Sequence, residues 1–278
     1  MSPARPAPAP SAMRALAWLY APGSQRPVLA ALGAIEEEIG ASLRPGLDHQ
    51  VAHLRLEWWR AECARTAQGR PAHPLTHALT EAFAGGDPAP LAGLAGLVDT
   101  AVWDLAAATP ETQRELTGYC ERWAEAMVVP LARFAAPQVD AAAIRALGAG
   151  LREGELLARL APDAHAGRLR LPLDELAAAQ VDPSRLAVPP WPAALAALVS
   201  AQHRALRQKL ATAVAGLPRE AQPALRTLLV WAALADAASR RAEWRLPQAP
   251  SGRDDHAVLD GWRAWRAARR AEAGRFRL

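Results

Sequence analysis

Four carboxylates in this sequence stand where they could bind a metal ion. Glu36, Glu37 and Glu38 are consecutive near the end of one predicted helix, and Asp163 lies in a later segment. Carboxylate oxygens are the ligands that Mg²⁺ prefers, and the ion needs several of them in near-octahedral geometry. Glu36 or Glu37 together with Asp163 is the magnesium site that the sequence could form.

Three arginines surround Asp163 in the sequence. Arg159, Arg168 and Arg170 could form an anion-binding patch, because guanidinium groups bind phosphate without a metal. The whole chain favours arginine, since Lys209 is its only lysine. GC-rich coding DNA explains that bias as well, and solvated loop residues explain the three arginines as well. The patch is therefore one of two hypotheses.

Two pairs of histidines have the four-residue spacing that places side chains on one face of a helix. They are His49 with His53, followed by Glu57, and His73 with His77. Such a pair could hold zinc, most readily with a carboxylate one turn further on. Both pairs lie at the start of a predicted helix, where polar side chains are solvated, and the proline after His73 disfavours helical geometry there. We expect neither pair to bind metal.

The last predicted helix combines apolar and basic residues. Val258, Trp262 and Trp265 form an apolar edge beside six arginines: Arg263, Arg266, Arg269, Arg270, Arg275 and Arg277. Such a surface could contact an anionic membrane or a nucleic acid. A terminal helix that packs through its tryptophans and leaves its arginines in water explains the pattern too, and we favour that interpretation.

The elements that must position these residues are predicted to be helices. The chain has 278 residues, 51% hydrophobic and 22% charged, with only three Phe and two Tyr. Alanine-rich sequence that is poor in strand formers favours helices and is too apolar for disorder. Caps, among them Thr109 and Asp182 before prolines, and glycines delimit segments at 12–20, 26–42, 47–68, 74–84, 89–107, 110–135, 138–161, 192–216, 219–244 and 254–272. In the segment 110–135, Leu116, Tyr119, Trp123 and Met127 recur at helical spacing and should form one buried stripe. We expect one all-α domain over 12–278, with 162–191 as its one long irregular stretch.

The remaining features bear on location. Residues 1–11, rich in Pro and Ala, are expected to be a disordered tail, and they have no apolar core typical of a secretion signal. No run of eighteen apolar residues predicts a membrane span. Cys63 and Cys120 cannot form a disulfide framework, which favours a reducing compartment. We expect a cytoplasmic protein, in which peripheral contact with the inner membrane is an option.

Four motifs follow one another along the chain. They are Arg26–Ile39, Leu54–Arg60 with Gly69–Pro74, Tyr119–Glu125, and Leu157–Pro172, which ends in Gly-Arg-Leu-Arg-Leu-Pro. In this order and at these intervals they resemble the squalene/phytoene synthase family, whose last motif ends in Gly-Arg-x-Tyr-Leu-Pro. The resemblance extends from about residue 14 to residue 270. It implies an isoprenoid-synthase fold, a single-domain helical bundle around a central cavity.

The resemblance also implies a reaction for active members, which join two prenyl diphosphates head to head. Aspartate-rich motifs on two facing helices hold Mg²⁺ ions that neutralise the leaving diphosphate. A dry apolar cavity protects the carbocation from water, and arginines and a tyrosine help to hold the phosphates.

This sequence departs from the family pattern at both metal motifs. No aspartate lies where the first pair should fall, and the three glutamates come about one turn early. In the second motif only Asp163 is kept, Arg159 replaces a ligand, and Pro162 should end the helix. Arg170 takes the place of the tyrosine.

Without charge neutralisation, an enzyme of this kind loses its largest catalytic contribution. We therefore expect a pseudoenzyme branch, similar to the mitochondrial respiratory complex I assembly factor of this fold. It would bind a partner protein, or an apolar or prenyl diphosphate ligand, with no cofactor and no nucleic acid. The alternative is an active prenyltransferase that holds Mg²⁺ with Asp163 and Glu36, Glu37 or Glu38. Glutamates that face Asp163 across one cavity would favour the alternative, and glutamates that point to solvent would disfavour it.

Overall fold

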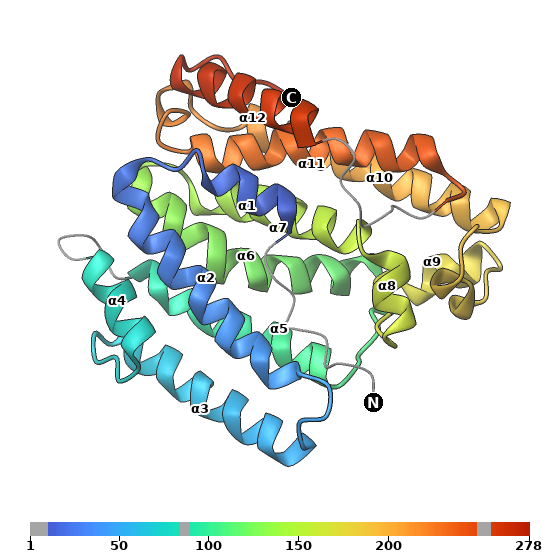
Figure 1. Cartoon of the computed structure of the whole chain (residues 1–278), viewed down its shortest axis with the longest axis horizontal. Helices are drawn as coiled ribbons and strands as arrows, with labels where there is room; N and C mark the ends of the chain where they lie inside the picture. Colours follow the sequence, from blue (N-terminus) through green and yellow to red (C-terminus); the bar gives the residue numbers. More distant parts are fainter. Residues whose placement is uncertain (1–10, 84–88, 249–256) are drawn as a thin grey trace.

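The structure is a computed structural model that describes residues 11–83, 89–248 and 257–278 (Figure 1). Within these ranges the chain forms α-helices, short 3-10 turns and no strand. The helices are α1 (Ala12–Trp18), α2 (Arg26–Gly40), α3 (His49–Ala67), α4 (Pro74–Ala82), α5 (Gly96–Leu105), α6 (Gln113–Ala135), α7 (Ala141–Leu157), α8 (Leu160–His165), α9 (Leu173–Ala178), α10 (Ala193–Ala215), α11 (Arg226–Arg245) and α12 (Ala257–Glu272). The predicted tail lies outside the described residues except for Ser11, which caps α1.

Helices α6 and α7 form the centre of the bundle (Figure 1). Helices α3 and α4 lie on one side of them, and α10, α11 and α12 lie on the other. The stripe predicted on α6 is confirmed, because Leu116, Tyr119, Trp123 and Met127 are all buried. Gly148 of α7 allows the two central helices to approach closely: a Cβ there would lie 2.7 Å from the Cβ of Ala124.

The segment 162–191 is more regular than expected. It contains most of α8, all of α9 and a 3-10 turn at Pro183–Ala187, so the expectation of a long irregular stretch is wrong. Pro162 does not end a helix either. The chain leaves helical geometry at Arg159, and Pro162 lies in the first turn of α8, where its missing N–H removes no helical hydrogen bond.

Helix α12 packs in the opposite sense to our expectation. Its buried face consists of small side chains, Ala264, Ala267, Ala268 and Ala271, whereas both of its tryptophans are exposed. The favoured interpretation, a helix docked by its tryptophans, is therefore wrong. The small alanines allow α12 to lie close against α11, and the large apolar residues are left outside. No helix among the described residues combines the length and the apolarity that crossing a membrane requires.

Candidate functional site

The three predicted glutamates of α2 do not act together. Glu37 and Glu38 are exposed, and the carboxylate of Glu38 lies 3.7 Å from Nη2 of the partly exposed Arg55. Glu36 turns into the bundle, where its carboxylate lies 2.7 Å from Nη1 of Arg14 and accepts a hydrogen bond of 2.8 Å from the Trp123 indole. Both oxygens of Glu36 are therefore engaged by groups that bind carboxylates.

Asp163 brings the three predicted arginines together. Its carboxylate lies 3.4 Å from Nη2 of Arg159, 3.8 Å from Nη2 of Arg168 and 3.7 Å from Nε of Arg170. Arg170 is 5% exposed and Arg159 is 51% exposed, so the cluster reaches from the interior to the surface. The hypothesis that these arginines are solvated loop residues therefore holds for Arg159 but not for Arg170. The arginines form a patch, and the anion that it holds is Asp163.

These carboxylates do not fit a magnesium ion. Among the described residues, no group of three or more His, Cys, Asp or Glu side chains is arranged to hold a metal. Glu36 and Asp163 each face guanidinium groups, whose positive charge opposes that of a divalent cation. Magnesium requires several hard oxygen ligands, and the carboxylate oxygens of Glu36 and Asp163 are already paired.

Sequence reasoning missed the polar residues between Glu36 and Asp163. A continuous series of ion pairs and hydrogen bonds, which we call the interior polar chain, links them through the centre of the bundle. Its members are Glu36, Arg14, Glu155, Arg152, Tyr119, Asp104, Arg170 and Asp163.

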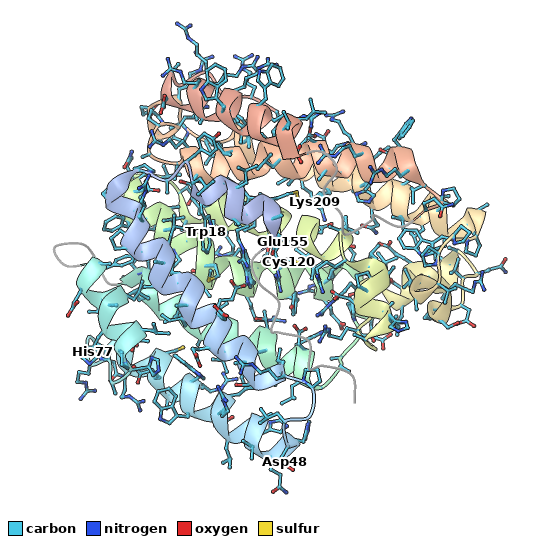
Figure 2. All side chains as sticks on the ribbon, in the orientation of Figure 1. Trp18, Asp48, His77, Cys120, Glu155 and Lys209 are labelled. Atoms are coloured by element: carbon cyan, nitrogen blue, oxygen red, sulfur yellow. The ribbon has the colours of Figure 1, made fainter. Side chains whose placement is uncertain are left out.

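The first half of the interior polar chain is centred on Glu155 of α7, which lies in the middle of the bundle (Figure 2). Its carboxylate lies 3.5 Å from Nε of Arg14 and 2.9 Å from Nη1 of Arg152, and it accepts a hydrogen bond from Ser11. Burial would raise the pKa of Glu155, but the two arginines outweigh it and the pKa is lowered. Glu155 is thus a buried, charged group.

The second half passes through Tyr119. Arg152 donates to the tyrosine oxygen at 3.4 Å, and the tyrosine donates in turn to Asp104 at 3.2 Å. Burial raises the pKa of Tyr119 above its ordinary value, which keeps the hydroxyl protonated as a donor. Asp104 also lies 2.8 Å from Nη2 of Arg170, so the residue in the tyrosine position of the family motif closes the chain.

The interior polar chain and the neighbouring Arg168 leave donors without hydrogen-bond acceptors. The Nε atoms of Arg14, Arg152, Arg168 and Arg170 are buried and have no hydrogen-bond partner. A buried N–H without an acceptor costs about 1–3 kcal/mol, more when it is charged. Such donors are the groups that an anion or a water molecule would satisfy.

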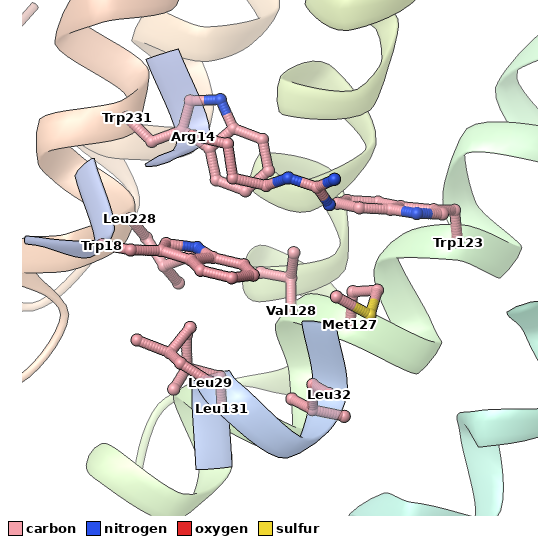
Figure 3. A pocket seen from close by; sticks show the side chains of 10 residues that line it. All are labelled: Arg14, Trp18, Leu29, Leu32, Trp123, Met127, Val128, Leu131, Leu228 and Trp231. Atoms are coloured by element: carbon pink, nitrogen blue, oxygen red, sulfur yellow. The ribbon is translucent and has the colours of Figure 1, made fainter. Parts of the chain in front are cut away.

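Arg14 also fills the apolar side of the interior. Its guanidinium lies 5.5 Å from the ring centres of Trp18 and Trp123 and 5.7 Å from that of Trp231, an arrangement visible in Figure 3. The hollow that these side chains line has a volume of about 10 Å³, which is room for about one water molecule. The family resemblance implies a central cavity. Between α1, α6 and α11, however, side chains of these helices occupy the space.

The histidine pairs have ordinary local roles. His49 and His53 are exposed, with their Nε2 atoms 3.1 Å apart. His73 is extended, as the following proline predicts, and its Nδ1 accepts a hydrogen bond of 3.2 Å from the backbone of Leu75 at the start of α4. His77 is exposed. Neither pair has a third ligand among the described residues.

Another buried carboxylate that was not predicted is Glu62 of α3. It accepts hydrogen bonds from the backbone of Ala72 at 2.8 Å and of His73 at 2.9 Å, from the Thr76 hydroxyl, and from Arg65. Burial would raise the pKa of Glu62, but the hydrogen bonds from Thr76, Ala72 and His73 outweigh it and lower the pKa to about 2. Glu62 thereby fixes the turn between α3 and α4.

Comparison with known proteins agrees with this architecture. Among solved structures, the chain is similar to a dehydrosqualene synthase in complex with ligand, with 15% identity, a TM-score of 0.72, and 94% of this chain and 90% of that chain covered. It is also similar to squalene synthase HpnC from Alicyclobacillus acidocaldarius, with 18% identity, a TM-score of 0.64, and 84% and 89% covered. At these identities the likeness shows the fold, that of the all-α isoprenoid synthases.

Sequence comparison identifies the family. No curated protein matches the chain significantly. The family model for squalene/phytoene synthase matches residues 7–263, which is most of the sequence. The chain therefore belongs to the squalene/phytoene synthase family.

Proposed function

We propose that this chain is a family member that binds a ligand or a partner without metal-dependent prenyl transfer. The ligand class is an isoprenoid or lipid that carries a phosphate or diphosphate group. The observation that carries the proposal is the pairing of Asp163, the one carboxylate kept from the second metal motif, with Arg159, Arg168 and Arg170.

That pairing opposes catalysis for an electrostatic reason. A departing diphosphate needs concentrated positive charge that the protein delivers on metal ions, and this is the largest contribution to the rate. Arginines at the same place would compete with Mg²⁺ for the carboxylate of Asp163, and their positive charge would repel the metal ion. Among the described residues, this pairing argues against a place to load Mg²⁺ and leaves arginines that can hold a phosphate.

The surface end of the cluster supports anion binding. Arg159 and Arg168 have side-chain exposures of 51% and 31%, so both guanidinium groups are within reach of a ligand from solvent. Arg168 also has a buried Nε that lacks an acceptor. The phosphate group of such a ligand would make charge-assisted hydrogen bonds here. The apolar part of the ligand would have to displace side chains such as Trp18.

The first experiment tests for the reaction itself. Purified protein is incubated with farnesyl and geranylgeranyl diphosphate, with and without Mg²⁺, and C30 or C40 products and released diphosphate are measured. We expect no product under either condition. A magnesium-dependent product would overturn the proposal in favour of an active prenyltransferase that holds Mg²⁺ with Glu36, Glu37 or Glu38 and Asp163.

The second experiment tests binding by calorimetry with a prenyl diphosphate. Asp163→Asn frees the arginines and should tighten binding, whereas Arg159→Ala with Arg168→Ala should weaken it by at least about tenfold, since each charge-assisted hydrogen bond is worth about 1.5–3 kcal/mol. Arg114→Ala, which removes an exposed arginine of α6, is the matched control. Unchanged binding in the double variant would refute the anion site, and absence of both turnover and binding would leave a protein partner as the ligand.

A further inference from the structure

The exposed side of α12 carries its largest apolar side chains. Val258 is 87% exposed, Leu259 50%, and Trp262 and Trp265 53% each. Buried tryptophans are among the most stabilising side chains in a protein, so two of them left in water on one helix are costly to solubility and add little to stability. We call this surface, with its neighbouring arginines, the outer face of α12.

Three arginines of the same helix complete the outer face. Arg266, Arg269 and Arg270 follow or interleave the apolar residues, and Arg269 is 67% exposed. Arg266 stacks on Trp262 with its Cζ atom 4.3 Å from the ring centre, which holds the cation at the edge of the apolar surface. From residue 257 to residue 278 the chain has six arginines against two acidic residues, Asp260 and Glu272, so the charge of this part of the molecule is strongly positive.

The position of α12 is fixed from its buried side. Asp260 is buried and lies 2.8 Å from Nη2 of Arg241 on α11 and 2.9 Å from Nη1 of Arg263. At the other edge the Tyr20 hydroxyl approaches the backbone oxygen of Gly261 at 3.5 Å. The helix therefore presents its outer face as part of a folded body and need not detach in order to bind.

We propose that the outer face of α12 docks on the surface of an anionic phospholipid bilayer, with the helix axis in the plane of the interface. Tryptophan rings prefer the headgroup region, aliphatic side chains prefer the acyl boundary, and guanidinium groups bind lipid phosphates. This face offers all three in one row. This proposal goes beyond the proposed function, because it places the protein at a membrane surface, where it could encounter an apolar ligand.

Two other partners fit the same face less well. A second copy of this chain, docked through the same face, would bring the arginines of two molecules together, and like charges oppose such a contact. A nucleic acid would engage the arginines but would leave Val258 and Leu259 in water, because a phosphate backbone needs cations and not aliphatic groups. The charge and the apolar residues together match the bilayer.

The test is sedimentation of the full chain with vesicles of phosphatidylcholine, with and without phosphatidylglycerol, at low and at high salt. We expect binding to the anionic vesicles that weakens at high salt, because ions screen the arginines. Trp262→Gln with Trp265→Gln should weaken binding by at least about tenfold, and so should Arg266→Glu, Arg269→Glu and Arg270→Glu together. Four of these side chains are exposed and that of Arg266 is partly exposed, and circular dichroism and the melting temperature check that each variant is folded.

Matched controls distinguish the effect of the outer face of α12 on binding from that of the overall charge and tryptophan content. Trp58→Gln with Trp244→Gln removes two exposed tryptophans of α3 and α11, and it should bind as the wild type does. Arg44→Glu, Arg70→Glu and Arg114→Glu remove three exposed arginines elsewhere and change the net charge equally. Equal loss in the controls and the α12 variants would overturn the proposal, as would absence of binding to anionic vesicles. Preferential binding to a DNA or RNA duplex over anionic vesicles, or self-association through α12, would overturn it in favour of those partners.

Discussion

Nη2 of Arg170 lies 2.8 Å from Oδ1 of Asp104, and this pair joins the end of α5 to the segment between α8 and α9. The side chains are 5% and 13% exposed. Arg170 stands where the family motif has a tyrosine. Relative to that motif, this chain therefore has a buried positive charge in place of a phenol. The bundle accommodates that charge because Asp104 and Asp163 both face it.

Removing the cation of this pair should be strongly destabilising. Arg170→Met leaves Asp104 buried beside Tyr119 without its cation, and breaking a buried pair in this way costs about 3–5 kcal/mol. Urea unfolding of the variant measures the loss. Asp104→Asn combined with Arg170→Met should recover part of it. The control is Arg159→Met, which affects a mostly exposed pair worth about 1 kcal/mol or less. An equal cost for the two single variants would contradict the prediction.

The stability of the chain should depend on Glu62 in acid. The pKa of Glu62 is lowered from 4.5 to about 2 in the folded chain, so its contribution is complete above pH 4.5 and is lost as the pH falls towards 2. Glu62→Gln should cost about 1–3 kcal/mol at neutral pH and should flatten the decline of the unfolding free energy between pH 5 and pH 2. Glu57→Gln, at an exposed position of the same helix, should change neither. An acid profile identical to that of the wild type would refute this role.

Replacement by alanine should have opposite effects on stability at Gly33 and at Gly40, two glycines of α2. A Cβ on Gly33 would lie 2.8 Å from the ring of Trp18, so Gly33→Ala should displace the tryptophan and destabilise the chain. A Cβ on Gly40 would meet nothing within 4 Å, and Gly40→Ala should be neutral or stabilise by up to about 1 kcal/mol. Thermal unfolding and near-ultraviolet circular dichroism distinguish them. Two variants of equal stability would show that Trp18 does not pack against this helix.

Both cysteines should resist modification in the native chain. Burial raises the pKa of Cys63 and that of Cys120 to about 12, so neither thiol is ionised near neutral pH. Ellman's reagent at pH 8 should react slowly with the folded protein and rapidly with both thiols in urea. Fast reaction of one thiol under native conditions would contradict the burial of that residue.

The fold was accessible from the sequence because its signals are local. Periodic stripes such as Leu116 to Met127 and the cap at Asp182 depend on residues a few positions apart, and both are confirmed. The cap predicted at Thr109 is wrong by three residues: Thr112 accepts the first hydrogen bond of α6 instead. The two threonines are chemically alike, so spacing alone does not choose between them.

The site was less accessible because its contacts are distant in the chain. Glu36 meets Trp123 across 87 positions, and Ser11 meets Glu155 across 144. No local pattern marks such pairs, although the family motifs did direct attention to Asp163 and its arginines. The orientation of α12 was missed for a different reason: alanines and tryptophans both count as apolar, so each side of the helix qualified as a buried face.

The tryptophan shell around Arg14 also sets an order of events during synthesis. Trp231 is added to the growing chain more than two hundred residues after Arg14, a delay of roughly 10 to 40 s at typical elongation rates. Throughout that interval the first helix has only part of its final surroundings. The contacts between α1 and α11 can therefore form only after most of the bundle has been made, whereas those with Glu36 and Trp123 become available earlier.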